Sequence, residues 1–242
     1  MAAARVTPGA HLLEIGPGKG ALTSLLASQS ENLTLVEPDT ELARRIATEY
    51  PQAEVIGAKA EDVDYTALPG PLVVVSNLPY YASVHIYKHL TACKSNISAM
   101  VLMFQKEVAD RISGQPGGRH YGSLSVWSGY NWEMTEVLAV PPEAFIPPPK
   151  VKSVVLRFVP HALPPVEGDE DALFPLVRAS FTHKRRTMKN NLKGIYSPES
   201  MDAAYDAAGL GINVRAEAVS LQQFAAMLPL LHQVGETLET DS

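Results

Sequence analysis

The feature that most constrains the fold is a series of short apolar runs without polar alternation. Leu72–Ser76 and Ala99–Phe104 are the clearest examples, and Leu33–Val36 is a further run interrupted only by Thr34. A strand that is apolar at every position is buried on both faces, which is typical of a parallel sheet covered by helices. Helical patterns separate these runs, so the sequence predicts an α/β fold with helices on both faces of the sheet.

The same reasoning places the remaining elements of the first half. It predicts strands over His11–Ile15 and Ala53–Gly57, and helices over Ala21–Ser28, Asp39–Glu49 (with Asp39 as N-cap) and Ser83–Ala92.

The pattern changes after about residue 131. We expect Trp132–Val140 and Val151–Val159 to be sheet-edge strands on either side of the proline-rich stretch Pro141–Pro149. His161–Asp171 is rich in proline, glycine and acids and is predicted to be a linker. Beyond it we expect only helices, over Ala172–Thr182, Thr187–Leu192, Pro198–Ala208 and Leu221–His232. The predicted domains are therefore residues 1–160 and 172–242.

Composition limits the class of protein. The single cysteine, Cys93, excludes an intramolecular disulfide and a cysteine-based metal cluster, and we expect it in the core. No run approaches the ~18 apolar residues of a membrane helix. Met1–Val6 is too short for the apolar region of a signal peptide. These features favour a soluble, cytoplasmic protein.

The net charge of −6 argues against nucleic acid at first sight, but the charge is unevenly distributed. Residues 31–64 carry nine acids, whereas residues 183–193 carry five Lys or Arg residues and no acid. Because local charge decides what a surface attracts, the second segment is a candidate phosphate-binding surface. A solvated helix face is the alternative.

The strongest local motif is a glycine-rich turn over Gly16–Gly20, directly after the first predicted strand. Glycine permits a tight turn and lets a ligand approach the backbone. Glu37 follows the second strand, where a carboxylate can bind a ribose diol. Together they predict a nucleoside pocket at the carboxyl ends of the strands, and glycines that serve packing alone are the alternative.

A second motif, Asn77-Leu78-Pro79-Tyr80, follows the strand Leu72–Ser76. Pro79 stiffens the turn and disfavours helical geometry at Leu78. The Leu78 carbonyl and the Asn77 side-chain oxygen can then face one point and accept both hydrogens of an exocyclic amine. Tyr80 supplies an aromatic face for the attached base. The simpler interpretation is a turn with an N-cap asparagine and a core tyrosine.

Seven motifs occur in a fixed order: Leu13–Gly20, Asn77–Tyr80, Phe104–Arg111, Tyr121–Ser125, Phe145–Arg157, Phe181–Leu192 and Arg215–Glu217. In this order they resemble the bacterial small-subunit (16S) rRNA adenine N6,N6-dimethyltransferases, over about residues 8–230. The resemblance implies a Rossmann-like catalytic domain with a small helical C-terminal domain, and S-adenosylmethionine as methyl donor. It implies two adjacent adenosines of small-subunit rRNA as substrate, each dimethylated, in an assembling 30S particle.

The resemblance also assigns the donor site. It implies that Gly16 and Gly18 line the donor and that Glu37 binds its ribose. The family usually has an aspartate that bonds the donor's adenine amine, and here that position is Lys59, which cannot accept a hydrogen bond. The backbone of Ala60 can still contact the ring. The family's N-terminal Q-N-F-L motif is absent, so we expect either a shortened chain or a more open donor site.

For the target base, the resemblance implies that Asn77 and Leu78 hold the amine, with Asn77 also bordering the donor. Tyr80 would stack on one face of the adenine and Phe145 would close the other, although Phe145 could equally be an anchor for its loop. An adenine amine is a poor nucleophile, whereas the donor's methyl group is already activated. Positioning should therefore supply most of the rate, and we expect no metal.

The RNA contacts are expected in the basic segment, at Lys184, Arg185, Arg186 and Lys189, which would position phosphates without reading sequence. Arg119, in a loop over Gln115–His120 that we expect to be mobile, is a further candidate. The expected partner is small-subunit rRNA, with no membrane, and the expected state is a monomer.

Two other functions remain open. One is a large-subunit rRNA adenine methyltransferase of the macrolide-resistance type, which shares the donor loop and an N-[IL]-P-Y motif. The Phe181–Leu192 segment favours the small-subunit enzyme. The other is a non-catalytic rRNA-binding assembly factor, or a transcription-factor relative, that has lost donor binding. Lys59 and the missing N-terminal motif are the features that favour it.

Overall fold

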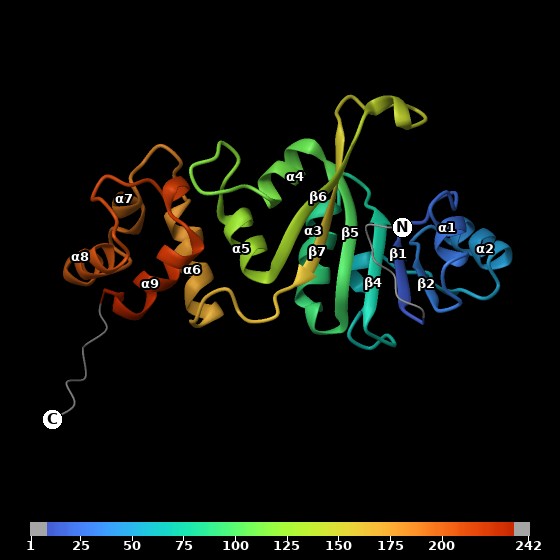
Figure 1. The fold of residues 1–242 in the computed structure, drawn as a ribbon, viewed down its shortest axis with the longest axis horizontal. Helices are drawn as coiled ribbons and strands as arrows, with labels where there is room; N and C mark the ends of the chain where they lie inside the picture. Colours follow the sequence, from blue (N-terminus) through green and yellow to red (C-terminus); the bar gives the residue numbers. More distant parts are fainter. Residues whose placement is uncertain (1–8, 235–242) are drawn as a thin grey trace. The chain divides into compact units, whose positions relative to one another are not determined.

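The computed structural model describes residues 9–234 and divides them into two compact units (Figure 1). Residues 1–8, where the family's Q-N-F-L motif would join, and residues 235–242 lie outside the described residues. The first unit contains residues 9–109 and 132–160, and the second contains residues 110–131 and 161–234.

The first unit is built on one seven-stranded sheet in the order β3-β2-β1-β4-β5-β7-β6. The strands are β1 (His11–Ile15), β2 (Leu33–Val36), β3 (Glu54–Ile56), β4 (Leu72–Asn77), β5 (Ile97–Gln105), β6 (Trp132–Val140) and β7 (Ser153–Pro160). The first five strands pair in parallel, while β7 runs antiparallel to both β5 and β6. The predicted parallel sheet is therefore confirmed, and each predicted strand exists.

The two last strands were both expected at the edge of the sheet, and this is wrong for β7. Met100 on β5 and Met134 on β6 both pair with Phe158 of β7, so β7 is an interior strand. Phe158 is fully buried, which explains why this strand needs a neighbour on each side. Of these two strands, β6 alone forms an edge of the sheet, and most of its residues from Glu133 on are exposed.

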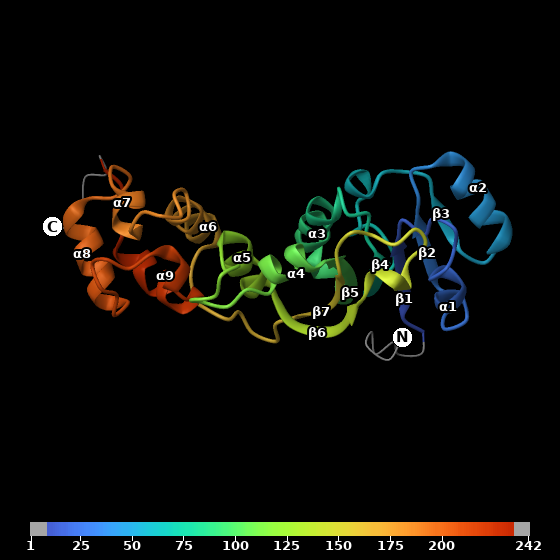
Figure 2. The same cartoon turned by 90° about the horizontal axis from the view of Figure 1, so that it is seen from above.

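Helices cover both faces of the sheet (Figure 2). Leu26 of α1 (Thr23–Ala27) and Ile46 of α2 (Thr40–Glu49) pack into one apolar cluster with residues of β1, β2, β4 and β5. On the other face, Tyr87 of α3 (Ser83–Ala92) contacts Phe104 and Phe158 edge-on or tilted. The Asp39 carboxylate accepts from the N–H groups of Glu41 and Leu42, as expected of an N-cap.

The helix α4 (Lys106–Ile112) follows β5 and belongs to the first unit up to residue 109, and the other regular elements of the second unit are helices. Its helices are α5 (Ser123–Asn131), α6 (Glu170–Ser180), α7 (Met188–Leu192), α8 (Pro198–Ala207) and α9 (Leu221–Met227). The last helix ends five residues earlier than predicted, and a 3-10 turn containing Pro229 follows it. Among residues 9–234, no helix has both the length and the apolar character needed to span a bilayer.

The second unit begins earlier in the chain than the predicted division at 160–171. Residues 110–131 were assigned to the first domain, but Tyr121, Val126 and Tyr130 belong to the core of the second unit. The Tyr121 hydroxyl donates to the Val219 carbonyl at 2.8 Å, across 98 residues of sequence. Burial of these three side chains against the C-terminal helices therefore sets the unit boundary.

Candidate functional site

The glycine-rich turn connects β1 to α1 at the carboxyl edge of the sheet. Gly16 and Gly18 have φ values of +66° and +57°, in the left-handed region that strains other residues. The Gly16 N–H donates to the Val36 carbonyl at the end of β2. Lys19, inside the turn, is exposed. Glycine is therefore favoured at these two positions because of the backbone conformation, and because it has no side chain it also leaves the backbone of the loop uncovered.

Glu37 lies directly after β2, buried with 5% of its surface exposed. Its carboxylate accepts from the Gly18 N–H at 3.2 Å through Oε2 and from the Asp39 N–H at 3.0 Å through Oε1. The predicted neighbourhood of Glu37 and the glycine loop is therefore present. A carboxylate has about four acceptor positions, so these two bonds leave acceptor capacity for a ligand.

Glu14 is a buried acid that sequence reasoning did not single out. It lies on β1 just before the glycine turn, and the Thr23 hydroxyl donates to it at 2.7 Å. Burial raises the pKa of Glu14 to about 7, and the bond from Thr23 offsets part of the rise. A single acid inside the otherwise apolar run Leu12–Ile15 was the available signal.

Lys59 and Ala60 follow β3, the strand next to β2. Lys59 is exposed and precedes the 3-10 turn Ala60–Asp62. The Ala60 carbonyl accepts from the buried Tyr65 hydroxyl at 2.8 Å, which fixes the turn. The Glu37 N–H donates to the Ile56 carbonyl, so the end of β3 is joined directly to the end of β2.

The Asn77-Leu78-Pro79-Tyr80 turn begins on the last residue of β4. Asn77 is exposed, while the Leu78 side chain is buried. Within residues 9–234, neither the Asn77 side chain nor the Leu78 carbonyl has a hydrogen-bond partner. The simpler interpretation of Asn77 as a helix N-cap is wrong, because the N-cap of α3 is Ala82 and no side chain caps that helix.

A small cavity of about 240 Å³ adjoins this turn. Its lining consists of Asn77, Leu78, Pro79, Tyr80, Phe145, Pro147 and Pro149. Four residues named from the sequence for the target base, Asn77, Leu78, Tyr80 and Phe145, therefore line the same cavity. The volume is below the ~300–1,000 Å³ of pockets for drug-sized ligands, which suits a single base.

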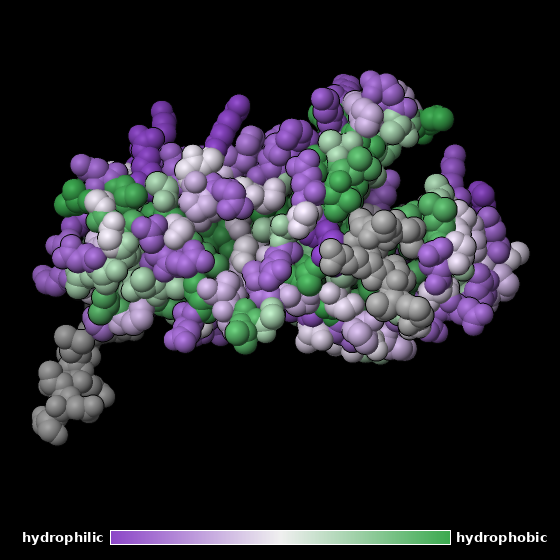
Figure 3. Space-filling model, viewed as in Figure 1, coloured by the Kyte–Doolittle hydropathy of each residue, from purple (hydrophilic) through white to green (hydrophobic). Residues whose placement is uncertain are grey.

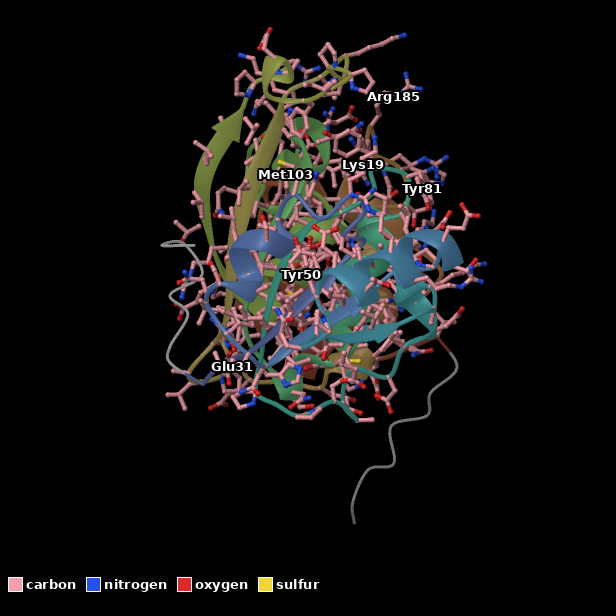
Figure 4. The ribbon with its side chains drawn as sticks, turned by 90° about the vertical axis from the view of Figure 1, so that its right-hand side faces the viewer. Lys19, Glu31, Tyr50, Tyr81, Met103 and Arg185 are labelled. Atoms are coloured by element: carbon pink, nitrogen blue, oxygen red, sulfur yellow. The ribbon has the colours of Figure 1, made fainter. Side chains whose placement is uncertain are left out.

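The glycine loop and this turn adjoin one another, because β1 and β4 are neighbours. A β-carbon on Gly16 would lie 3.8 Å from Cδ of Pro79. The Ser76 hydroxyl donates to the Ile15 carbonyl at 2.5 Å, which locks the two strand ends together. Lys19 and Tyr81 lie toward this end of the sheet, whereas Glu31 lies toward the other (Figure 4).

A larger cavity of about 510 Å³ lies at the amino ends of the strands, lined by His11, Asn32, Pro71 and their neighbours. It contains none of the residues expected to bind a ligand. Ligands of open α/β sheets bind at the carboxyl ends of the strands, so we assign the site to the smaller cavity.

The hairpin of β6 and β7 exposes apolar side chains near the site. Ile146 is fully exposed, and Val137, Leu138 and Val151 are also exposed. Figure 3 shows apolar surface along this hairpin and at its tip.

In the second unit, the basic segment begins with a turn between α6 and α7. Lys184, Arg185 and Arg186 are exposed, and no ion pair within residues 9–234 involves them. The Asn191 amide donates to the carbonyls of Ser180 and His183 and braces the turn. These three cations lie in the turn before α7 and not on a helix face, and their contact with phosphates stays a prediction.

Lys189 and Arg119 differ from those three. Lys189 lies in α7 and forms an ion pair with Asp202 of α8, so its charge is partly neutralised. Arg119 is exposed, but its loop is tied down by a bond from the Gly117 N–H to the Glu217 carbonyl at 2.7 Å. The mobility expected for this loop stays a prediction.

Histidine and cysteine add no further chemistry to the site. His85 and His89 are four residues apart on α3, and His89 Nε2 is bonded to the Val63 carbonyl at 2.7 Å. Within residues 9–234, no group of three or more His, Cys, Asp or Glu side chains is arranged to hold a metal. Cys93 is buried, as predicted.

The sheet order, with a glycine loop after β1 and an acid after β2, defines the class of Rossmann-like methyltransferases. Two solved structures have a similar fold. The 23S rRNA methyltransferase ErmE has a TM-score of 0.76 and 28% identity, covering 95% of this chain and 94% of that chain. A dimethyladenosine transferase from Plasmodium falciparum has a TM-score of 0.74 and 23% identity, covering 94% and 92%. At that identity, the second likeness shows the fold alone.

The sequence model of the ribosomal RNA adenine dimethylase family matches residues 1–233, so the chain belongs to this family. Two relatives are named "Ribosomal RNA small subunit methyltransferase A". The one from Acidobacterium capsulatum is 41% identical, over 89% of this chain and 79% of its own length. The one from Geobacter sulfurreducens is 40% identical, over 98% of this chain and 91% of its own length.

Proposed function

We propose that the protein transfers methyl groups from S-adenosylmethionine to the N6 atoms of two adjacent adenosines in small-subunit rRNA. The observation that carries the proposal is the cavity beside the glycine loop. Asn77 and Leu78 line it together with Tyr80 and Phe145, and within residues 9–234 the Asn77 side chain and the Leu78 carbonyl have no hydrogen-bond partner. Two acceptors match the two hydrogens of an adenine amine, and two rings match the two faces of a base.

The residues of the glycine loop fit a nucleoside donor. Gly16 and Gly18 present bare backbone, and Glu37 is already fixed by two backbone bonds with acceptor capacity left for a ribose. When bound, S-adenosylmethionine supplies an activated methyl group on its sulfonium, and the broken S–C bonding pair stays on sulfur. Lys59 cannot bond the donor's adenine amine, so Glu61 or Asp62, both exposed in the same turn, are the available acceptors.

The chain's contribution to the reaction is orientation. The Asn77 and Leu78 oxygens hold both N6 hydrogens, so the nitrogen lone pair is less delocalised into the ring and points toward the donor's methyl group. The lone pair forms the new N–C bond, and one N6 proton then leaves to solvent. Such positioning supplies most of the rate when the electrophile is already activated.

The small-subunit substrate is supported by relatives 36–41% identical to this chain that carry small-subunit names. The exposed turn at Lys184–Arg186 supplies cations for rRNA phosphates. An assembling 30S particle in the cytoplasm, bound by a monomer, is the setting we propose. The likeness to ErmE keeps a large-subunit substrate as the alternative outcome of the test.

The test is the variant Asn77→Ala. Losing one of two oriented acceptors should slow single-turnover methyl transfer by a factor on the order of 10²–10³, the range found when one oriented hydrogen bond is removed from an active site. RNA binding should stay at the parental level, because Asn77 does not touch phosphate in this proposal. Unchanged transfer by Asn77→Ala would remove the basis of the assignment.

A further inference from the structure

We propose that Ser153 is a positioning residue that fixes the ring of Tyr80 in the base pocket. This inference rests on the proposed function, in which Tyr80 stacks on the target adenine. The hydroxyl oxygens of Tyr80 and Ser153 are 2.9 Å apart, although the residues are 73 positions apart in the chain. Ser153 is fully buried and Tyr80 is partly exposed at the cavity, so the bond joins the pocket wall to the interior.

Ser153 is held rigidly on its own side. It begins β7 and pairs with Gln105 on β5 and with Val140 on β6. The carbonyl of Lys152, immediately before it, accepts from the Lys106 N–H at 2.9 Å. The Ser153 hydroxyl is therefore mounted on an interior strand that is bonded on both sides.

Tyr80 is held at its other end as well. Its carbonyl accepts from the Ser83 hydroxyl at 3.1 Å, and the Pro79 carbonyl accepts from the Ala82 N–H at 3.0 Å. With its backbone fixed by the turn and its hydroxyl fixed by Ser153, the ring is held in one side-chain rotamer, with its long axis in one direction. Stacking on a base depends on where the ring lies, and a ring tethered only at its backbone would sample other rotamers.

The second methyl transfer should depend on this ring more than the first. An unmethylated amine offers two hydrogens to the Asn77 and Leu78 oxygens, whereas a monomethylated amine offers only one. One acceptor then no longer orients the nitrogen, and the stack with Tyr80 must supply a larger share of the positioning. Loosening the ring should therefore cause monomethylated product to accumulate.

The test is a double-mutant cycle on methyl transfer to unmodified small subunits. Removing one neutral hydrogen bond changes an equilibrium by roughly 2- to 10-fold. We expect Ser153→Ala and Tyr80→Phe each to lower kcat/KM by about five-fold, with a higher ratio of monomethyl to dimethyl adenosine. The double variant should lose about five-fold as well, because both changes delete the same bond.

A control removes a buried hydroxyl of the same unit away from the site. Thr91 on α3 is buried, and its hydroxyl accepts from the Trp132 indole at 3.0 Å. Thr91→Val should lower the melting temperature and leave kcat/KM and the product ratio unchanged. Donor affinity measured by calorimetry should be parental in all of these variants.

Two results would overturn the role of Ser153 while leaving the proposed function intact. One is parental kinetics and product ratio in Ser153→Ala. The other is multiplied losses in the double variant, about 25-fold, which would mean that the two hydroxyls act separately. A parent protein that does not methylate small subunits would instead contradict the proposed function itself.

Discussion

Replacing Glu37 by alanine removes the carboxylate that joins the glycine loop to the end of β2. In the structure this group accepts from the Gly18 N–H at 3.2 Å and from the Asp39 N–H at 3.0 Å. We propose that it also accepts from the ribose of the donor. The variant therefore loses a direct contact and part of the order of the loop that contacts the donor.

A hydrogen bond to a charged group contributes about 1.5–3 kcal/mol. Glu37→Ala should therefore weaken S-adenosylmethionine binding by roughly 10- to 150-fold, measured by calorimetry. Glu37→Gln should fall between this variant and the parent. Its amide oxygen replaces one acceptor, but its NH₂ group cannot accept from the remaining backbone N–H.

The matched control is Glu41→Ala, which removes an exposed carboxylate in the first turn of α2. This variant should bind the donor like the parent, and none of the three should change RNA affinity. Equal donor affinity in Glu37→Ala and the parent would refute the reasoning and leave Glu37 as a structural residue.

Three further predictions concern charge. Replacing Lys184, Arg185 and Arg186 by serine should weaken small-subunit binding at low salt. The slope of log binding constant against log salt concentration should become shallower by up to ~0.9 for each lost phosphate contact. Filter binding at three salt concentrations tests this, and parallel lines for variant and parent would reject the contacts. In the parent, the free energy of unfolding should fall by at most ~3 kcal/mol as pH rises from 4.5 through about 7, because burial raises the Glu14 pKa and penalises its charged form. Glu14→Gln should abolish this loss. Urea unfolding of both proteins at pH 5 and pH 8 tests this, and the same pH dependence in variant and parent contradicts it. Lys59→Asp should tighten donor binding several-fold by restoring an acceptor; calorimetry showing equal or weaker binding would count against that placement of the donor's adenine.

Most strands of the first unit could be predicted because both faces of each are buried. An apolar run such as Leu72–Val75 carries that information in every residue. The interior position of β7 was not predictable in the same way, since a run of residues does not identify its neighbours. The assignment of α5 to the second unit depends on Tyr121, Val126 and Tyr130, whose partners lie far away in the sequence.

The candidate site shows the same difference between what the local sequence predicts and what only the fold determines. Glu37 and the Asn77–Tyr80 turn were predictable because each directly follows a strand, and parallel strands bring their carboxyl ends together. The bonds that fix these residues were not predictable. The Glu37 bond to Gly18 and the Tyr80 bond to Ser153 depend on distances that only the fold sets. Nothing in the local sequence distinguishes Ser153 from other serines.

The most direct test is methyl transfer by the parent protein to three substrates in parallel: unmodified small subunits, unmodified large subunits and naked small-subunit rRNA. Labelled S-adenosylmethionine would be the donor, and the modified nucleosides would be separated after digestion. We predict N6,N6-dimethyladenosine at two adjacent positions of the small-subunit rRNA, and no label on the large subunit. Label on large subunits alone, or none on any substrate despite measurable donor binding, would contradict the account.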